Sequence, residues 1–113
     1  MEKVWSHADD VVMMPPYGGR FEGWQAVQEQ FKHFPELKMT GRIVQENLST
    51  TVHGDLGYAV FREVGRDLKI NGKPVNLDSR GCDIFRREDG QWKMVVGHCD
   101  TSPSLIAAAG GGG

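Results

Sequence analysis

The sequence predicts an α+β domain in which helices pack on one face of an antiparallel sheet. Residues 23–34 place apolar side chains at three- and four-residue intervals, which is typical of an amphipathic helix. Residues 37–101 instead form β-rich runs separated by short turns that contain Asn, Asp or Gly. Because the strands follow the helix as a group and do not alternate with helices, the pattern favours α+β over a parallel α/β sheet.

Before the main helix, the chain is expected to form a short helical turn and a small hairpin. Residues 3–9 carry apolar side chains on one side of a helical turn. Residues 11–14 predict a strand that ends at the double proline that follows, because proline cannot donate to a strand ladder. Residues 20–22 begin a return strand, and Pro35 ends the helix of residues 23–34.

Four antiparallel strands in a meander are expected after the helix. They span residues 37–52, 56–67, 75–87 and 91 to about 101. Gly41 predicts a bulge in the first of these strands. The pair Asn71-Gly72 is the strongest hairpin signal in the chain, since both residues tolerate the positive φ of a type I′ turn.

Length and composition describe one globular domain without nucleic-acid or membrane partners. The 113 residues fit one domain over residues 1–101, followed by a low-complexity tail over 102–113 that is either a flexible end or a remnant of cloning. A net charge of −2 with dispersed basic residues argues against nucleic-acid binding, and no apolar run is long enough to span a membrane. No signal peptide is visible. Two cysteines without spaced histidine ligands favour a cytoplasmic protein with no structural zinc and no cofactor.

Three segments carry a resemblance to a known family. Residues 8–23 contain Ala-Asp-Asp-Val-Val, a proline, a glycine and a Phe-x-Gly entry to the helix, residues 56–59 read Leu-Gly-Tyr-Ala, and residues 83–95 read Asp-Ile-Phe-Arg-Arg-Glu-Asp-Gly-Gln-Trp-Lys-Met-Val. With the order of elements, these segments resemble the SnoaL-like branch of the nuclear transport factor 2-like superfamily, which shares its fold with ketosteroid isomerases. The last hairpin and its His98-Cys99 ending also look like the association domain of calcium/calmodulin-dependent protein kinase.

The resemblance implies a cone-shaped, strongly curved antiparallel sheet with helices on its concave face. Members of the superfamily usually begin with a long amphipathic helix across that face, and the resemblance implies that this helix is lacking here. A large uncovered apolar face is rare on a monomer. We therefore expect a homodimer formed through sheet faces, with the concave face covered by a partner subunit, by residues 104–109 folding back, or by an upstream stretch.

The turn that joins the last two strands decides which face each of their side chains occupies. A type I′ turn centred on Asp89 and Gly90 places Glu88 opposite Gln91. A type I turn with Gly90 as a left-handed bulge residue places Arg87 opposite Gln91 instead. We favour the bulged turn, because Glu is poorly suited beside an Asp-Gly type I′ turn. The choice matters because a slip of one residue moves every side chain to the other face.

In the favoured register, the two faces of this hairpin differ in chemistry. The face suited to a pocket has small residues and one carboxylate. It carries Ser79, Gly81, Asp83, Phe85, Val95, Gly97 and Cys99. The opposite face is apolar with a charged end and suits contact with another subunit. It carries Asp78, Arg80, Cys82, Ile84, Trp92, Met94, Val96, His98 and Asp100. We expect four residues of this face at an interface or at the pocket rim: Arg80, Trp92, His98 and Asp100.

Asp83 is the candidate catalytic residue. In an apolar cavity its pKa would rise, so that it could donate or shuttle a proton; the alternative is a structural salt bridge with a neighbouring arginine. The expected ligand-binding residues are Trp5, Met14, Tyr17, Trp24, Gly81, Val95, Gly97 and Cys99. For Trp5 and Trp24 the alternative is core packing, and for Tyr17 it is an ordinary turn residue. Cys99 is expected to be an apolar filler, since nothing positions a base to activate its thiol.

The chain departs from the ketosteroid isomerases at the residues that would carry their chemistry. Those enzymes use an aspartate base before a proline, and a tyrosine with a protonated aspartate as the oxyanion hole. By resemblance, Pro15 stands at the position of the base and Gly81 at that of the oxyanion aspartate. We therefore expect no ketosteroid isomerase but a pocket protein that binds a small apolar or weakly acidic organic ligand, with general acid–base catalysis left open. The alternative is a non-catalytic dimerisation module with a vestigial cavity.

Arginine side chains could favour an acidic ligand. Arg62, Arg66 and Arg80 would help to bind a carboxylate if any of them points into the pocket, which alternation along the strands does not decide.

Overall fold

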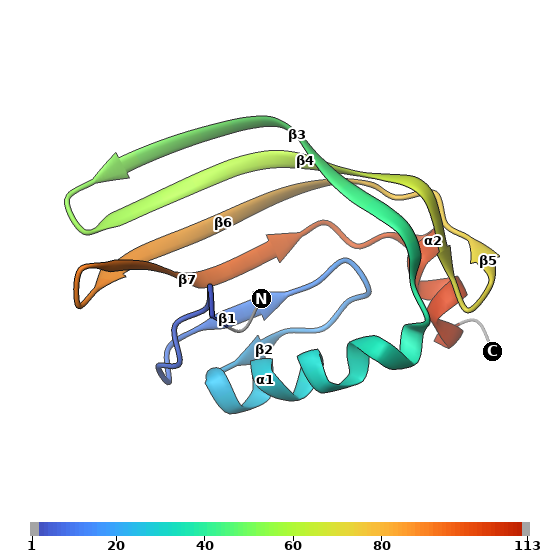
Figure 1. Cartoon of the computed structure of the whole chain (residues 1–113), viewed down its shortest axis with the longest axis horizontal. Helices are drawn as coiled ribbons and strands as arrows, with labels where there is room; N and C mark the ends of the chain where they lie inside the picture. The colour runs from blue at the N-terminus through green and yellow to red at the C-terminus, as the bar shows by residue number, and fades with distance from the viewer. Residues whose placement is uncertain (1–2, 112–113) are drawn as a thin grey trace.

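A computed structural model describes residues 3–111 as one curved mixed sheet with helices beside it (Figure 1). The strands are β1 (Val12–Met14), β2 (Phe21–Glu22), β3 (Thr40–His53), β4 (Leu56–Ile70), β5 (Lys73–Pro74), β6 (Asp78–Glu88) and β7 (Gln91–Cys99). The helices are α1 (Trp24–His33), η1 (Phe34–Leu37), α2 (Pro103–Ile106) and η2 (Ala107–Gly111). The strand order is β2-β1-β7-β6-β4-β3, with β5 paired to β4. The α+β prediction and the expected meander of β3, β4, β6 and β7 are confirmed.

The expected helical turn over residues 3–9 is wrong. Trp5 instead forms a parallel β-bridge with Met94. The backbone N–H of Ser6 donates to the carbonyl of Met94 (2.9 Å), and the N–H of Met94 donates to the carbonyl of Val4 (2.7 Å). Because β1 pairs in parallel with a later part of β7, the segment and β1 together satisfy the edge of β7. Backbone hydrogen bonding to this edge therefore overrides the helical spacing of the apolar residues.

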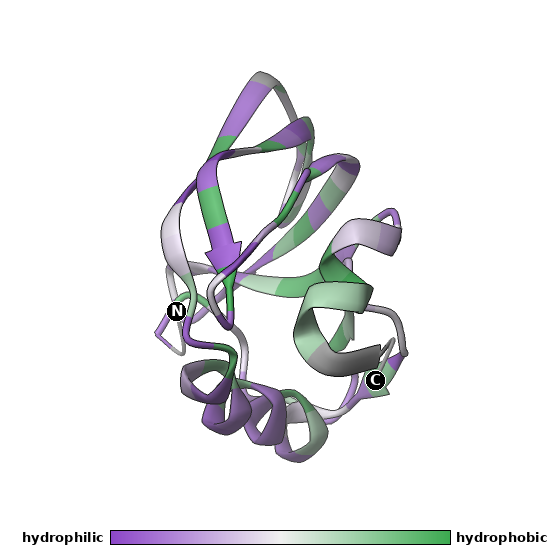
Figure 2. Ribbon diagram, turned by 90° about the vertical axis from the view of Figure 1, so that its right-hand side faces the viewer, coloured by the Kyte–Doolittle hydropathy of each residue, from purple (hydrophilic) through white to green (hydrophobic). Residues whose placement is uncertain are grey.

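Helix α1 confirms the predicted amphipathic helix. Val27 is fully buried on its inner side, and the outer side is hydrophilic (Figure 2). Gly23 precedes the helix with a φ of 84°, a backbone conformation that favours glycine. Pro35 falls in the first turn of η1, where its missing N–H costs no hydrogen bond. The chain therefore changes to a 3₁₀ turn at the proline before it enters β3.

Two features of the β3–β4 hairpin follow from glycine. The ladder shifts register between Thr40 and Arg42, which confirms the bulge expected at Gly41. A Cβ on Gly41 would lie 2.2 Å from the carbonyl oxygen of Asp67, so no other residue fits there without backbone movement. At the other end, Gly54 and Asp55 form the turn that pairs His53 with Leu56. A second irregularity, between Glu46 and Ser49, had no sequence signal.

The turn between β6 and β7 differs from the favoured prediction. Asp89 and Gly90 both have positive φ (50° and 79°), and Glu88 pairs with Gln91, as in a type I′ turn. The bulge lies instead at Val95, because Phe85 pairs with Met94 while Ile84 pairs with Val96.

This bulge determines which β7 residues face the cone. Beyond it, Asp83 pairs with Gly97 and Gly81 pairs with Cys99. Before the bulge, the observed pairing differs from the favoured one by one residue, and beyond the bulge it differs by two. A shift of two residues leaves each side chain on the same face. These pairs therefore share a face, as they do in the favoured register. The turn prediction is therefore wrong, whereas its grouping of Gly81, Asp83, Gly97 and Cys99 on one face holds. Met94, expected on the opposite face, shares the face of Phe85.

The C-terminal segment is helical and not a flexible end over residues 103–111. The side chain of Ser102 accepts a hydrogen bond from the backbone N–H of Leu105 (3.2 Å), which caps α2. Leu105 and Ala108 are buried in a cluster whose other members come from the far end of the sheet. These members are Leu68, Ile70, Val75 and Leu77. The helical segment lies beside that end in Figures 1 and 2, so folding back of this segment, one of the three expected covers, is observed.

Candidate functional site

A cavity of about 290 Å³ lies between the concave face of the sheet and the α1–η1 helices. Its wall is mainly apolar and aromatic. Prominent members are Trp5, Met13, Phe31, Phe34, Ile70 and Met94. The rings of Trp5 and Phe31 meet edge to face with centroids 6.3 Å apart, and those of Phe31 and Phe34 meet at 5.3 Å. Met39 and Ile43 also line the cavity but are 52% and 37% exposed, so it opens on the side of β3.

Strand pairing brings two carboxyl groups and a thiol to this cavity. Asp83 of β6 lies between Ala59 of β4 and Gly97 of β7 in the ladder. Both neighbours are small, and the ring of Trp5 lies over Gly97. Glu63 of β4 and Cys99 of β7 also line the cavity. The inner face of the sheet therefore presents polar groups at the bottom of an otherwise apolar chamber.

The surroundings of Asp83 change its acidity. Burial, and after it the negative charge of Glu63, raise the pKa of the Asp83 carboxyl from its ordinary value of 3.8 to about 6. No salt bridge to Asp83 is found among the described residues, in contrast to the structural alternative considered above. A group with this pKa can exchange a proton near neutral pH, which an acid–base catalyst requires.

Cys99 is held in its protonated form. Burial raises the pKa of its thiol well above the usual range, and the charge and hydrogen bond of Glu63 raise it further. The thiol is therefore a poor nucleophile, which agrees with its expected place as a small filler of the cavity wall.

Glu63 and Met94 line the cavity without having been predicted to do so. Glu63 shares its parity along β4 with Ala59 and Phe61, which are both buried, but alternation in the sequence does not show that this parity faces inward. No local signal marks the bulge at Val95 that turns Met94 inward.

The predicted ligand-binding residues divide into two groups. Five of them line the cavity: Trp5, Met14, Tyr17, Gly97 and Cys99. The others do not line it: Trp24, Gly81 and Val95. The ring of Trp24 stacks on His7 at 3.9 Å, and Val95 is buried in the core as the bulge residue. Gly81 lies under the ring of Phe61, where an added Cβ would come within 2.4 Å of the ring.

Of the residues expected at an interface or rim, Arg80 lies on the outer side of the sheet, whereas Trp92 pairs with Arg87 and so shares the face of Phe85 and Asp83. Arg80 pairs with Asp100 at 2.7 Å, and the guanidinium of Arg87 lies 4.9 Å from the ring centroid of Trp92. His98 is exposed and touches the cavity at its rim.

The arginines that could have bound an acidic ligand are engaged in ion pairs away from the cavity. Arg62 donates to Asp78 (2.6 Å), and Arg66 donates to Glu46 (2.6 Å). Neither these two arginines nor Arg80 lines the cavity. Among the described residues, the lining contains two carboxyl side chains and neither lysine nor arginine.

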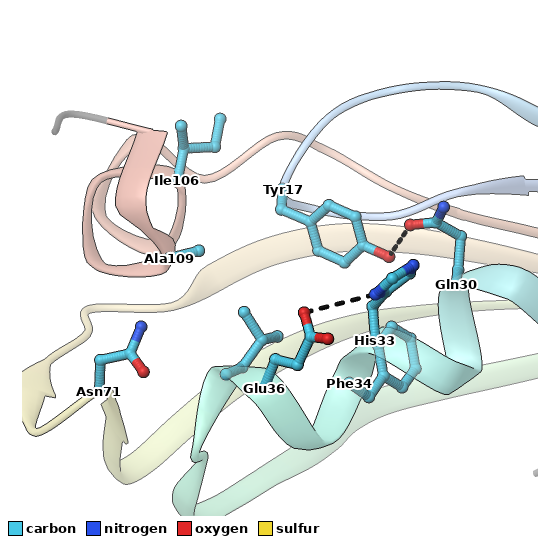
Figure 3. Close-up of a pocket in the computed structure, with 9 residues that line it drawn as sticks. Tyr17, Gln30, His33, Phe34, Glu36, Asn71, Ile106 and Ala109 are labelled. Atoms are coloured by element: carbon cyan, nitrogen blue, oxygen red, sulfur yellow. Dashed lines mark hydrogen bonds and ion pairs between the residues drawn. The ribbon is translucent and has the colours of Figure 1, made fainter.

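A second cavity, of about 430 Å³, lies between the α1–η1 junction and the C-terminal helix. Figure 3 shows Tyr17 and His33 on one side of it and Ile106 and Ala109 on the other. The hydroxyl of Tyr17 donates to the side-chain oxygen of Gln30 (2.9 Å), and burial raises the pKa of this phenol. Tyr17 also lines the first cavity. Its proton is therefore already used, and its oxygen can only accept a hydrogen bond from a ligand.

Metal-binding clusters and membrane-spanning helices are not found within residues 3–111. No three His, Cys, Asp or Glu side chains of this range are placed to hold a metal ion. None of the helices described has the length and apolarity needed to cross a membrane.

The sequence profile of the SnoaL-like domain matches residues 6–95. This chain belongs to the SnoaL-like family. The match includes β1, α1, β6 and the first half of β7, so the SnoaL-like resemblance and the expected cone-like fold are confirmed. Among curated protein sequences, none matches this SnoaL-like chain.

Solved structures with the same fold carry varied descriptions. An association domain of calcium/calmodulin-dependent protein kinase type II type from Thiobacillus denitrificans is 20% identical, with a TM-score of 0.72 over 89% of this chain and 79% of that chain. A protein named as a dehydratase of the NTF2-like family, from Streptomyces avermitilis, is 18% identical, with a TM-score of 0.73 over 88% and 78%. One named as an aromatic ring hydroxylase, from Novosphingobium aromaticivorans, is 19% identical, with a TM-score of 0.72 over 88% and 71%. At these identities the likeness shows the fold alone.

Proposed function

We propose that this SnoaL-like protein binds a small, largely apolar organic molecule in the cavity above Asp83. The observation that carries the proposal is an aromatic chamber of about 290 Å³ whose polar groups converge from β4, β6 and β7. Ligand sites in proteins are typically concave, mostly apolar and supplied with few polar groups. The volume is at the lower end of the usual range of roughly 300–1,000 Å³, which fits a fragment-sized ligand.

The same geometry supports a role for Asp83 in proton transfer. Its pKa of about 6 lies close to neutral pH, so both protonation states are accessible under ordinary conditions. Glu63 supplies the second carboxyl group that the sequence analysis did not find. The pair fits general acid–base chemistry on a ligand that stays in the cavity, and it does not require the thiol of Cys99.

Of the two ligand classes expected from the sequence, the charges favour the apolar one. A weakly acidic ligand would enter the cavity as an anion and would meet Asp83 and Glu63, with no arginine or lysine among the described lining residues. Like charges at close range in a partly buried site repel each other.

A fragment screen followed by NMR tests the proposal. Ligands are expected to shift the backbone resonances of Gly97 and Cys99 and the indole resonance of Trp5. Asp83→Asn is expected to weaken binding and to abolish any turnover while the protein stays folded. Asp55→Asn, in the exposed β3–β4 turn, is the matched control and should bind as the wild type does. Shifts that cluster away from the cavity, or unchanged binding by Asp83→Asn, would contradict the proposal.

A second candidate function is assembly, which one feature of the outer face favours. Leu56, Tyr58 and Val60 alternate with buried residues along β4 and are 53%, 45% and 41% exposed. They lie beside Ile84 and Cys82 of β6 in the ladder. We propose that this face forms a homodimer, because an apolar patch on a sheet is costly to leave in water.

Analytical ultracentrifugation at micromolar concentration tests the dimer. The wild type should sediment as a dimer, and Tyr58→Glu should sediment as a folded monomer. Thr50→Glu, on the same hairpin but paired with the inward Ala59 and therefore on the opposite face, is the control for the added charge. A wild-type monomer with a cooperative melt would refute the dimer.

A further inference from the structure

We propose that the occupant of the cavity is an organic amine, whose ammonium group lies between Asp83 and Glu63 and whose apolar body lies against the aromatic wall. This inference rests on the proposed ligand-binding function and adds the chemical class of the ligand. Three separate features of the cavity support it: its charge balance, its aromatic wall, and one unpaired donor.

The described lining of the cavity contains two carboxyl groups and neither lysine nor arginine. Asp83 and Glu63 line the cavity from neighbouring strands, and the negative charge of Glu63 adds to the cost of ionising Asp83. The arginines of these strands pair elsewhere. Arg62 bonds to Asp78, Arg80 to Asp100, and Arg86 to Asp10 and Glu88. Within residues 3–111 no ion pair of the two carboxylates is found, so a cation from solution could supply one. A buried charge is stable only when it is paired.

The wall of the cavity suits a cation attached to an apolar body. Trp5, Phe31, Phe34 and Tyr17 all line it, and successive rings meet at angles between 67° and 88°. Rings arranged in this way present both faces and edges toward the enclosed space. Aromatic faces attract ammonium groups, whereas they give no such attraction to an anion.

The third feature is a donor without a partner. Trp5 is 2% exposed, and its Nε1–H has no hydrogen-bond partner among the described residues. An unpaired buried donor costs free energy that a ligand oxygen can recover. Because Trp5 lies in the cavity wall, this donor favours an amine that also carries an ether, hydroxyl or carbonyl oxygen.

Three probes that differ only in their terminal group test the inference. They are 2-phenoxyethylamine, 2-phenoxyethanol and phenoxyacetate, which are a cation, a neutral molecule and an anion at pH 7.5. All three contain an aromatic ring and an ether oxygen. Titration of the full chain is followed by the indole resonance of Trp5 and the backbone resonances of Gly97.

The amine is expected to bind about tenfold to a hundredfold more tightly than the alcohol, which is the gain in affinity that a hydrogen bond to a charged group typically gives. Phenoxyacetate is expected to bind most weakly. Glu63→Gln and Asp83→Asn should each reduce this preference, and the double variant should remove it. Glu46→Gln removes the same charge from the neighbouring position of the ladder but on the outer face, so it should keep the preference.

The other outcomes have different meanings. If the alcohol or phenoxyacetate binds at least as tightly as the amine, the amine inference is overturned while ligand binding in the cavity stands. If the preference survives in both Glu63→Gln and Asp83→Asn, the proposed location of the ammonium is overturned. If none of the probes binds at millimolar concentration, and the fragment screen also finds no cavity ligand, the proposed function fails together with the inference.

The pH dependence gives an independent readout. Below about pH 6 Asp83 takes up a proton and loses its negative charge. This change weakens the attraction of the cavity for an ammonium group, while the raised pKa values of Cys99 and Tyr17 keep both of these groups neutral. Amine affinity should therefore fall as the pH is lowered through this range, and affinity that rises instead would overturn the inference.

Discussion

Replacement of Asp83 by asparagine should make the protein more stable at pH 8. Asparagine has nearly the same shape but no charge, so the variant removes the cost of holding a carboxylate in the cavity. That cost follows from the pKa of Asp83, which rises from 3.8 to about 6 on folding. Because the folded state binds the proton more tightly than the unfolded state, the wild type loses stability as the pH rises from about 4 to above 6.

The size of the effect can be worked out from the same shift. The difference between 3.8 and about 6 corresponds to roughly 3 kcal/mol at 1.36 kcal/mol per unit. Asp83 is only partly shielded from solvent, so water reduces this value, and we expect about 1–2 kcal/mol at pH 8. For a domain of this size, the gain corresponds to a rise in Tm of about 3–10 °C.

Urea denaturation at pH 4 and pH 8 measures the prediction. The difference between Asp83→Asn and wild type should be large at pH 8 and small at pH 4, where the wild-type carboxyl is itself protonated. The comparison isolates Asp83, since other carboxylates titrate equally in both proteins. Asp55→Asn should change stability by less than about 0.5 kcal/mol, as is usual at exposed positions. A variant no more stable than wild type at pH 8, or equally stabilised at both pH values, would refute the reasoning.

Three further predictions concern the cavity and its floor. Cys99 should react with a thiol reagent more slowly than Cys82 up to pH 9, because burial and nearby carboxylates keep the Cys99 thiol protonated. Mass spectrometry that identifies the first labelled cysteine checks this prediction, and faster labelling of Cys99 would contradict it. Gly81→Ala should lower the free energy of unfolding by about 1–3 kcal/mol, as is typical of overpacking, because the added Cβ would lie 2.4 Å from the ring of Phe61. Denaturant unfolding of this variant tests the prediction. The combination with Phe61→Leu should recover part of the lost stability. Isomerisation of a Δ5-3-ketosteroid should be undetectable above background, because Pro15 and Gly81 offer no base and no oxyanion donor; measurable enzymatic turnover would show that the first strand has been misaligned.

The fold was largely predictable because its main elements have strong local signals. The helix α1 and the turns at Gly54-Asp55 and Asn71-Gly72 follow from apolar spacing and turn residues. The bulge at Gly41 follows from a single glycine. The parallel pairing of β1 with β7 was not predictable in this way, since no local pattern shows which sheet edge a short strand will meet.

The site was predictable only in part, because its location depends on long-range register. Asp83 was identified, although the turn from which this was argued proved wrong and a bulge at Val95 compensated for it. Glu63 was missed because the outward Tyr58 and the inward Phe61 could not be distinguished by alternation alone. Their exposures of 45% and 7% separate the two faces of β4 clearly. Alternation in the sequence shows which residues share a face of the strand, but it does not show which of the two faces is buried.

The bulge at Val95 gives this hairpin a way to change its chemistry without changing its turn. If β7 kept all its residues but lost the bulge, Val96 and His98 would face the cavity in place of Gly97 and Cys99, while β6 and its Asp83 stayed where they are. The chamber would then hold an imidazole beside a carboxyl group, a combination suited to a different set of reactions. Deletion of Val95 would have the opposite result, since it would remove the irregularity and preserve the present pairing of Asp83 with Gly97. One extra residue in a strand thus separates two chambers of different reactivity on the same scaffold.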